Sequence, residues 1–184
     1  MAINSVSFPL ALSRSGQYLY CSLHKVKNPS QLSKRLKNDD NLALINANRL
    51  VGISQLCCAA NMACNRNRPT WDTVFLSAAS SHLGHVLRDY AFLGEEDSRQ
   101  DDEKAEEEAM VVVFMVSSDS QASYEKWLEN YGLGEPMPNM EDYLLTQQEN
   151  SKADFQTWYK LTDQELSSSS LEACLLTKIA TKMV

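Results

Sequence analysis

Three side chains near the middle of the chain, His82, His85 and Asp89, have the types and the spacing of metal ligands. Positions i, i+3 and i+7 share one face of a helix, and a catalytic metal usually takes three ligands of these kinds. Apolar residues such as Leu83 and Val86 define the core side of the same helix, which leaves the histidines near its edge. Histidines at such spacing are common by chance on protein surfaces. We therefore predict no metal site here, and keep a metal-dependent enzyme that uses these three residues as an alternative hypothesis.

Other catalytic groups are scarce in this sequence. It contains no Gly-x-Ser-x-Gly elbow, no Walker-type phosphate loop and no Gly-x-Gly-x-x-Gly fingerprint. Cys57 and Cys58 lie in a strongly apolar segment, where burial raises the pKa of a thiol and keeps it unreactive. Glu95 and Glu96 lie in a hydrophilic stretch with no pocket to shift a carboxyl pKa. The sequence therefore predicts a protein that is not an enzyme and has no catalytic residues and no cofactor.

Basic residues concentrate in the first half of the chain, where residues 1–93 hold ten Lys and Arg against four Asp and Glu. The best basic groups are Lys34 and Arg35, on a predicted helix, and Arg66 and Arg68, in a connection after another helix. A cluster of this kind can bind the phosphates of a nucleic acid. A second hypothesis is therefore a stand-alone tRNA- or RNA-binding protein that uses these four residues.

One short stretch accounts for the formal net charge of −7, because residues 94–109 hold nine acidic and two basic side chains. So many like charges without an aromatic residue predict a mobile acidic loop. The rest of the chain carries fifteen charges of each sign. It contains no apolar run long enough to span a bilayer, so we expect no membrane partner.

Hydrophobic periodicity predicts the elements that must position these residues. Four segments are predicted strands, residues 17–26, 42–45, 72–77 and 110–116, and the last is an unbroken apolar run typical of a central strand. Helices are predicted to begin near residues 29, 50, 80, 120, 139, 151 and 170. The helix over residues 50–64 is apolar nearly all round and should be central and buried. The sequence therefore predicts a single α/β domain over the whole chain, with an about four-stranded mixed sheet packed with helices and a helical C-terminal third.

The last predicted helix carries more apolar surface than one core contact needs. Ser169 and Glu172 have capping-box spacing, which predicts a helix from about residue 170 to the end of the chain. Its apolar side chains cover an arc of roughly 220°, whereas a core-facing stripe needs little more than about 100°. Either this helix lies under other elements, or one of its faces binds a partner protein.

The sequence around this helix resembles one known family. Residues 159–166 (Tyr-Lys-Leu-Thr-Asp-Gln-Glu-Leu), 171–173 (Leu-Glu-Ala) and 179–182 (Ile-Ala-Thr-Lys) are similar to the C-terminal signature of the PRPK-binding protein family, a small subunit of the KEOPS/EKC complex. Residues 44–46 with the alanine-rich helix after them, and residues 72–77, also resemble the family. The resemblance covers most of the chain outside the acidic stretch, which looks like an insertion.

The resemblance implies a non-catalytic subunit that binds the small atypical kinase PRPK, mainly on its N-terminal lobe, in the cytoplasm and nucleus. In that family the complex carries out threonylcarbamoylation of adenosine in tRNA, and another subunit performs the chemistry. Archaeal-type members also bind tRNA. Our leading hypothesis is therefore a KEOPS/EKC adaptor whose partners are the kinase, the other subunits of the complex and tRNA.

We place the kinase contact on the C-terminal helix, with part of the surface of the helix over residues 50–64. The expected contact residues are the large apolar side chains of the last helix, with the first two as main anchors: Leu175, Ile179, Leu171, Leu176 and Met183.

Overall fold

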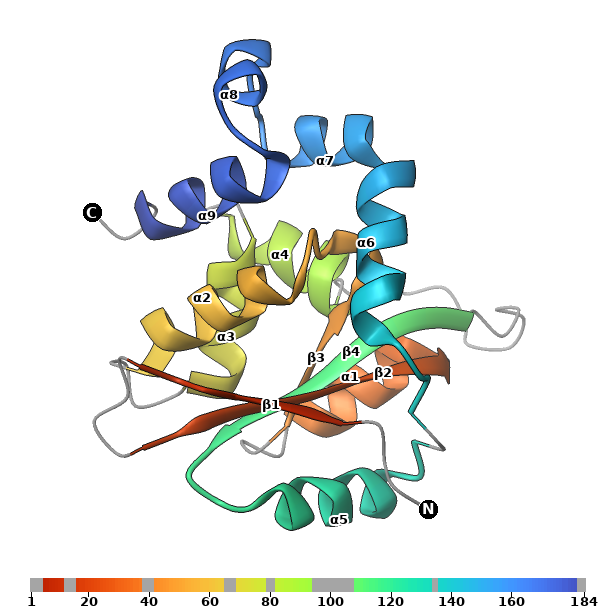
Figure 1. The fold of residues 1–184 in the computed structure, drawn as a ribbon. Coiled ribbons are helices and arrows are strands. Elements are labelled where there is room, and N and C mark those ends of the chain that lie inside the picture. Colours follow the sequence, from red (N-terminus) through yellow and green to blue (C-terminus); the bar gives the residue numbers. More distant parts are fainter. Residues whose placement is uncertain are drawn as a thin grey trace.

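The computed structural model describes residues 5–11, 16–37, 42–64, 69–78, 82–93, 108–133 and 136–181. Within them a four-stranded sheet has the order β1-β2-β4-β3, made of β1 (Val6–Pro9), β2 (Tyr18–Lys27), β3 (Ala43–Asn46) and β4 (Glu108–Ser117). Each neighbouring pair of strands is antiparallel (Figure 1). The predicted α/β class, the number of strands and the helical C-terminal third are confirmed, but the sheet is antiparallel rather than mixed.

Strand β4 lies in the interior of the sheet, as its unbroken apolar run predicts. Its residues alternate between two cores: Val112 and Phe114 face one side of the sheet, and Val111 and Val113 face the other. All four are fully buried. A strand covered on both faces needs apolar residues at every position, which explains why this strand shows no alternation.

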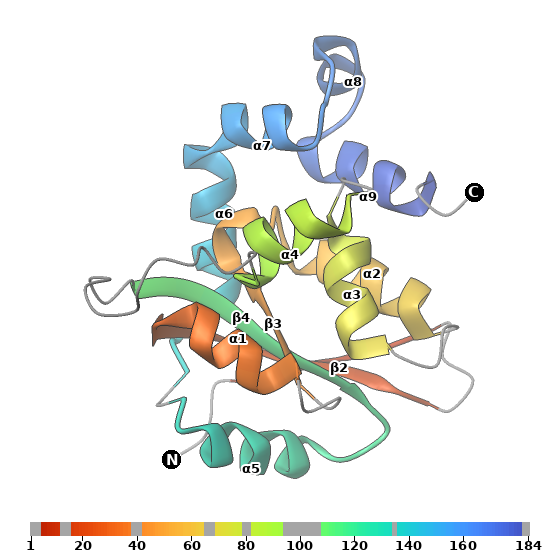
Figure 2. The ribbon, with the colours of Figure 1, turned by 180° about the vertical axis from the view of Figure 1, so that it is seen from behind.

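Helices cover both faces of the sheet (Figures 1 and 2). One face packs against α1 and α5, which contribute residues such as Leu36 and Tyr124 to that core. The core on the other face includes Leu56 of α2 and Val86 of α4. Helices α7, α8 and α9 lie beyond this layer, farther from the sheet, and α7 contributes Phe155 to the same core (Figures 1 and 2). The helices are α1 (Pro29–Lys37), the 3₁₀ helix η1 (Ala47–Arg49), α2 (Ile53–Ala63), α3 (Pro69–Ser77), α4 (Leu83–Ala91), α5 (Gln121–Tyr131), α6 (Met140–Asn150), α7 (Lys152–Trp158), α8 (Asp163–Ser168) and α9 (Leu171–Thr181).

One predicted strand is wrong. Residues 72–77 lie in helix α3, and the fourth strand of the sheet is β1, near the N-terminus. The run Thr73-Val74-Phe75 has high strand propensity, but a short apolar run is ambiguous between strand and buried helix. Pro69 is the first residue of α3, a position where proline favours a helix start, and α3 packs along α2. Tertiary packing therefore overrides the local preference.

Several predictions concern residues outside the described ranges. The predicted mobile acidic loop lies outside them except for Glu108 and Ala109, which begin β4. Arg66, Arg68 and Met183 also lie outside them. None of the described helices combines the length and the apolar character needed to cross a bilayer.

Candidate partner-binding surface

Residues 159–166, which carry most of the family resemblance, fix the position of the chain before α9 through buried hydrogen bonds and a capping box. Tyr159 is buried, and its hydroxyl donates to the Arg49 carbonyl at 2.6 Å and accepts from Gln55 Nε2 at 2.7 Å. Burial raises the pKa of Tyr159 well above its usual value, so this hydroxyl stays protonated and can donate. The same Gln55 accepts the Val51 N–H at 2.8 Å, so one buried amide connects α2 with the segment after η1 and with the end of α7.

A capping box starts the short helix α8. Thr162 Oγ1 accepts the Glu165 N–H at 3.2 Å, and the Glu165 carboxylate accepts the Thr162 N–H at 2.7 Å. The other carboxylate oxygen of Glu165 lies 3.3 Å from Lys178 Nζ on α9. Lys178 also donates to the Lys160 carbonyl at 3.0 Å. These contacts hold α9 in the orientation in which it returns to α2.

One face of α9 enters the core on the α2 side of the sheet. Its buried residues recur every three or four positions and are Leu171, Cys174, Leu175 and Ile179. The helix starts close to the predicted position, but its cap is Ser170 rather than Ser169: Ser170 Oγ accepts the Ala173 N–H at 3.2 Å. Glu172, the predicted partner of Ser169 in a capping box, accepts from Ser54 instead.

This packing corrects the predicted kinase contact. Leu175 and Ile179 have no exposed surface and Leu171 is 6% exposed, so these three side chains cannot touch a partner while the core is closed. Leu176 is half-buried at the surface, and Met183 lies outside the described residues. The apolar side chains of α9 cover more of its circumference than one core contact needs. The part that packs into the core contains Leu175 and Ile179, which were expected to face outward.

Glu172 shows which side of α9 faces α2. Its Oε1 accepts a hydrogen bond from Ser54 Oγ, and it lies 3.3 Å from where a Cβ would stand on Gly52. Gly52 precedes α2 and offers no side-chain cap, so the carboxylate stands at the positive end of that helix. Leu176 follows Glu172 by one helical turn on the same side, and it therefore lies next to α2.

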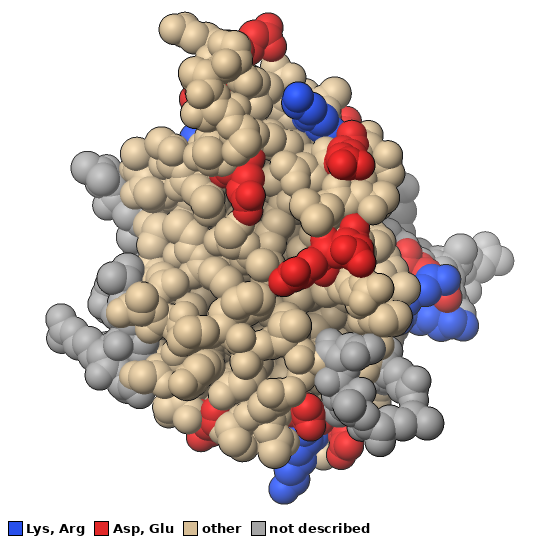
Figure 3. All heavy atoms as spheres, viewed as in Figure 1, with Lys and Arg blue, Asp and Glu red and all other residues tan. Residues whose placement is uncertain are grey.

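The outer sides of α2 and α9 form a surface with little charge, here called the α2–α9 face. Helix α2 contains no Lys, Arg, Asp or Glu and was predicted to be central and buried, with part of its surface in the kinase contact; one side of it is half-exposed. Figure 3 shows a wide area over α2 and α9 with few charged side chains, and acidic groups beyond it on α6. The half-buried or exposed apolar members of this face are Ile53, Cys57, Cys58, Met62, Ala173, Leu176 and Ala180.

The two thiols of this face are protonated. Burial raises the pKa of Cys57 to about 11, and Cys58 adds to the shift. Burial also raises the pKa of Cys58. A protonated thiol behaves as a small apolar group, so both cysteines add to the apolar area of the face. An uncharged apolar surface of this kind can pack against apolar side chains of another protein.

The predicted RNA-binding residues are only partly placed. Lys34 and Arg35 are exposed on α1, on the opposite face of the sheet from α9. The Arg35 guanidinium lies over the Tyr131 ring, 5.2 Å from its centroid. Arg66 and Arg68 lie outside the described residues.

His82 and His85 approach each other without forming a site with Asp89. Their ring centroids are 5.5 Å apart. Asp89 Oδ1 instead accepts from Arg88 Nε at 2.7 Å, and this hydrogen bond lowers the pKa of Asp89. Across the described ranges, no three His, Cys, Asp or Glu side chains are close enough to hold a metal ion.

A scan against models of protein families finds no match, and a search of curated proteins finds no similar sequence. A functional conclusion therefore depends on the residues and the geometry of the chain itself.

Proposed function

We propose that this protein is a non-catalytic subunit of the KEOPS/EKC complex that binds the small atypical kinase PRPK and so supports threonylcarbamoylation of tRNA. The similarity of residues 159–166, 171–173 and 179–182 to the PRPK-binding family supports the choice of partner. The structural observation that carries the proposal is the α2–α9 face, an apolar surface held in place by those same residues.

The α2–α9 face has the composition of an interface centre. Burial of apolar area stabilises a complex by about 25 cal/mol per Å², and an interface of ordinary size buries about 800 Å² on each partner. A few large side chains usually supply most of the binding energy. Leu176, Ile53 and Met62 are the large apolar side chains of this face, and we assign them as anchors. Leu175 and Ile179 support the face from below.

Contact with tRNA is the second part of the proposal. Helix α1 carries Lys34, Arg35 and Lys37 in its last turn, and no acidic residue. A basic helix of this kind can contact phosphates. Because α1 and α9 cover opposite faces of the sheet, kinase and tRNA would not compete for the same surface.

The kinase contact is tested by Leu176→Arg. An arginine at an apolar anchor must bury its charge in the complex, so we expect kinase binding to weaken by more than about thirtyfold. The free protein should keep its melting temperature because Leu176 is only half-buried. Co-purification with a PRPK-type kinase, followed by calorimetric titration, measures the effect.

The matched control is Leu145→Arg. Leu145 is a leucine on α6 that is 56% exposed, outside the α2–α9 face. The Leu145→Arg variant should bind the kinase with the affinity of the wild type. Unchanged kinase binding by Leu176→Arg, or an equal loss in the control, would show that the contact lies elsewhere.

A further inference from the structure

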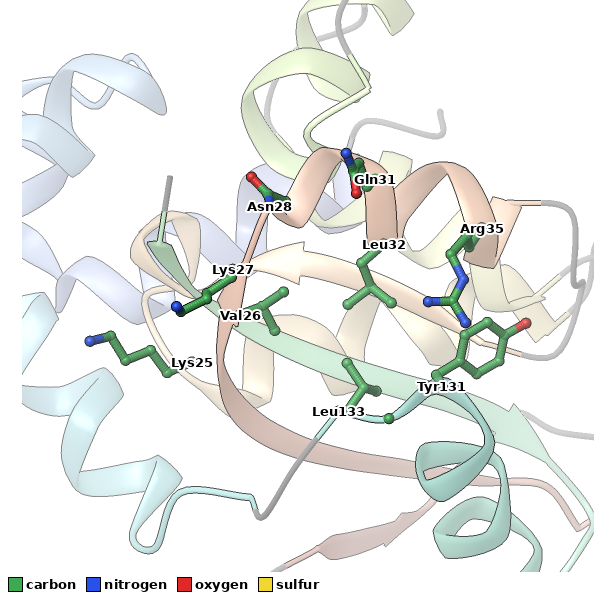
Figure 4. Close-up of a pocket in the computed structure, with 10 residues that line it drawn as sticks. Lys25, Val26, Lys27, Asn28, Gln31, Leu32, Arg35, Tyr131 and Leu133 are labelled. Carbon is green, nitrogen blue, oxygen red and sulfur yellow. The ribbon is translucent and has the colours of Figure 1, made fainter. Parts of the chain in front are cut away.

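A pocket of about 360 Å³ lies between the end of β2, the first turns of α1 and the C-terminal end of α5 (Figure 4). We call it the β2–α1–α5 pocket. It contains no residue of the α2–α9 face. Its volume is within the range of binding sites for small ligands, which begins at about 300 Å³.

Apolar side chains form the floor of this pocket. Val26 and Leu32 belong to the core between the sheet and α1, and Leu133 packs against the same core. Figure 4 shows these three side chains in the middle of the pocket. The floor can therefore hold an apolar group of a ligand.

Three polar side chains follow one another along the α1 side of this floor. Asn28, Gln31 and Arg35 are three and four residues apart, so they lie on one side of α1 (Figure 4). The Asn28 carbonyl accepts the N–H groups of Gln31 and Leu32, which fixes Asn28 in line with the helix. Among the described residues, neither of the two side-chain amides has a hydrogen-bond partner. Each amide can therefore donate to a ligand and accept from it.

The two lysines of the pocket are already engaged. Lys25 Nζ lies 2.5 Å from the carboxylate of Glu108. Lys27 also lowers the pKa of Glu108, though less than Lys25 does, and it has a further contact of its own. Neither lysine is therefore counted as a charge that awaits a ligand.

Arg35 is the cation that a ligand meets in this pocket. Its guanidinium is 5.2 Å from the centroid of the Tyr131 ring, a cation–π contact that uses the face of the group. In the part of the chain that the structure describes, no carboxylate forms an ion pair with it. The N–H donors at the edge of the guanidinium remain available, and two of them can bind one carboxylate. A single positive charge of this kind suits a ligand with a single negative charge.

We propose that the β2–α1–α5 pocket binds the C-terminal end of an extended peptide whose last residue is apolar. A terminal carboxylate carries one negative charge, and each peptide group before it offers one donor and one acceptor. The carboxylate is assigned to Arg35 and the last side chain to the apolar floor. The preceding peptide groups are assigned to Gln31 and then to Asn28.

The spacing of the polar groups fits an extended chain. A helix rises about 1.5 Å per residue, so Asn28 lies about 10 Å from Arg35 along α1. An extended peptide covers about 3.3 Å per residue, so about three residues span this distance. A single acylated amino acid that binds Arg35 is therefore too short to reach Asn28.

Three probes test the proposal by calorimetric titration of the full chain: acetyl-Ala-Ala-Leu with a free carboxylate, the same tripeptide with a C-terminal amide, and N-acetyl-leucine. The carboxylate tripeptide should bind more than about tenfold more tightly than its amide, which lacks the charge-assisted contact with Arg35. It should bind about fivefold more tightly than N-acetyl-leucine, which lacks one neutral hydrogen bond. Equal binding of the amide, or no binding of the carboxylate tripeptide at millimolar concentration, overturns the proposal. Equal binding of N-acetyl-leucine overturns the assignment to a peptide and leaves a site for small acids.

Two variants locate the site. Arg35→Gln should weaken binding of the carboxylate tripeptide by about tenfold, the usual cost of one charge-assisted contact. Asn28 has a φ of 54°, a left-handed conformation that glycine adopts readily, so Asn28→Gly removes the amide without straining the backbone. We expect Asn28→Gly to weaken tripeptide binding by about fivefold and to leave the binding of N-acetyl-leucine unchanged.

The matched control is Lys37→Gln, which removes a charge from the same helix outside the pocket. It should change tripeptide binding by less than about twofold. Equal effects of Lys37→Gln and Arg35→Gln overturn the proposal. These titrations contain neither the kinase nor tRNA, and the pocket shares no residue with the α2–α9 face, so their outcome does not bear on kinase binding.

Discussion

His24 is a buried histidine in a chain of hydrogen bonds on the α5 side of the sheet. Tyr124 donates to the Val113 carbonyl at 2.7 Å, so its oxygen accepts from Ser22 Oγ at 2.7 Å, and Ser22 in turn accepts from His24 Nε2 at 2.8 Å. This order places the proton on Nε2 and leaves Nδ1 without a hydrogen-bond partner among the described residues. Burial lowers the pKa of His24 to about 4, although the Leu133 backbone opposes this shift. His24 is therefore neutral at pH 7.

This histidine predicts a loss of stability in mild acid. The unfolded chain takes up a proton at His24 below about pH 6.5, whereas the folded chain resists it until about pH 4. The stabilisation is thus complete above pH 6.5 and falls as the pH drops through this window. Between pH 7 and pH 5 the wild type should lose about 2 kcal/mol more unfolding free energy than His24→Gln, which has no group that titrates there. Urea denaturation at the two pH values measures the difference, and parallel losses in both proteins would contradict it.

At the scale of elements, the junction between α9 and α2 depends on one carboxylate. Helix α2 has no acidic residue in its first turn and no side-chain cap, and Glu172 of α9 supplies negative charge there through Ser54. Glu172→Gln keeps the size of the side chain and removes the charge. We expect it to lower the unfolding free energy by about 1 kcal/mol, the usual worth of a charge at a helix end together with a charge-assisted hydrogen bond.

Denaturation with Glu129→Gln as control measures this effect. Glu129 is exposed at the end of α5, where loss of negative charge should change stability by less than about 0.5 kcal/mol. Glu172→Gln should also weaken kinase binding, because the hydrogen bond from Ser54 that fixes α9 against α2 becomes weaker. A variant as stable as the wild type would show that the carboxylate is solvated rather than bonded to Ser54.

Elements with strong local signals are predictable from this sequence. The apolar run of β4 and the periodic helices α5 and α6 need no tertiary information, since pattern and helix-start residues agree. The short β1 and the helix α3 are not predictable in this way. The half-buried β1 has four residues and ends at Pro9, and α3 depends on packing against α2. The capping box of Thr162 and Glu165 was available as a signal for α8.

The candidate site shows the same division. The apolar excess of α9 predicts a surface helix with more than one contact, but the outward face depends on where α2 lies. Glu172 binds Ser54, and this contact turns Leu175 inward and leaves Leu176 at the surface. In α2, the polar residues Ser54 and Asn61 are two turns apart and therefore lie on one side of the helix. Their positions could have predicted that this side faces outward. Periodicity predicts the width of an apolar arc, whereas packing decides its orientation.

At the scale of the whole molecule, the proposed tRNA contact predicts a dependence on salt. Each phosphate neutralised by Lys or Arg contributes a slope of about −0.7 to −0.9 to a plot of log affinity against log salt concentration. Lys34→Ala should make this slope less steep by about 1, because one phosphate contact is lost. Filter binding of tRNA over a salt series measures it.

The control for this series is Lys152→Ala. Lys152 is exposed at the start of α7, among the helices on the other face of the sheet, so the slope should stay that of the wild type. An affinity that does not depend on salt, or an equal change in both variants, would remove α1 from the tRNA contact.

The strand order also governs how this chain can fold. Strand β4 lies between β2 and β3, and both of these strands come earlier in the sequence. Each residue of β4 that pairs with β2 or β3 follows its partner by more than sixty residues. Until the chain has been synthesised beyond residue 117, β2 and β3 lack their common neighbour, and only the hairpin of β1 and β2 can form. Pairings over such sequence distance make folding slow, and the unpaired edges of β2 and β3 can associate with other chains in the meantime. A truncated chain that ends before β4 should therefore accumulate as aggregate, and the yield of folded protein should depend on how quickly β4 reaches its place.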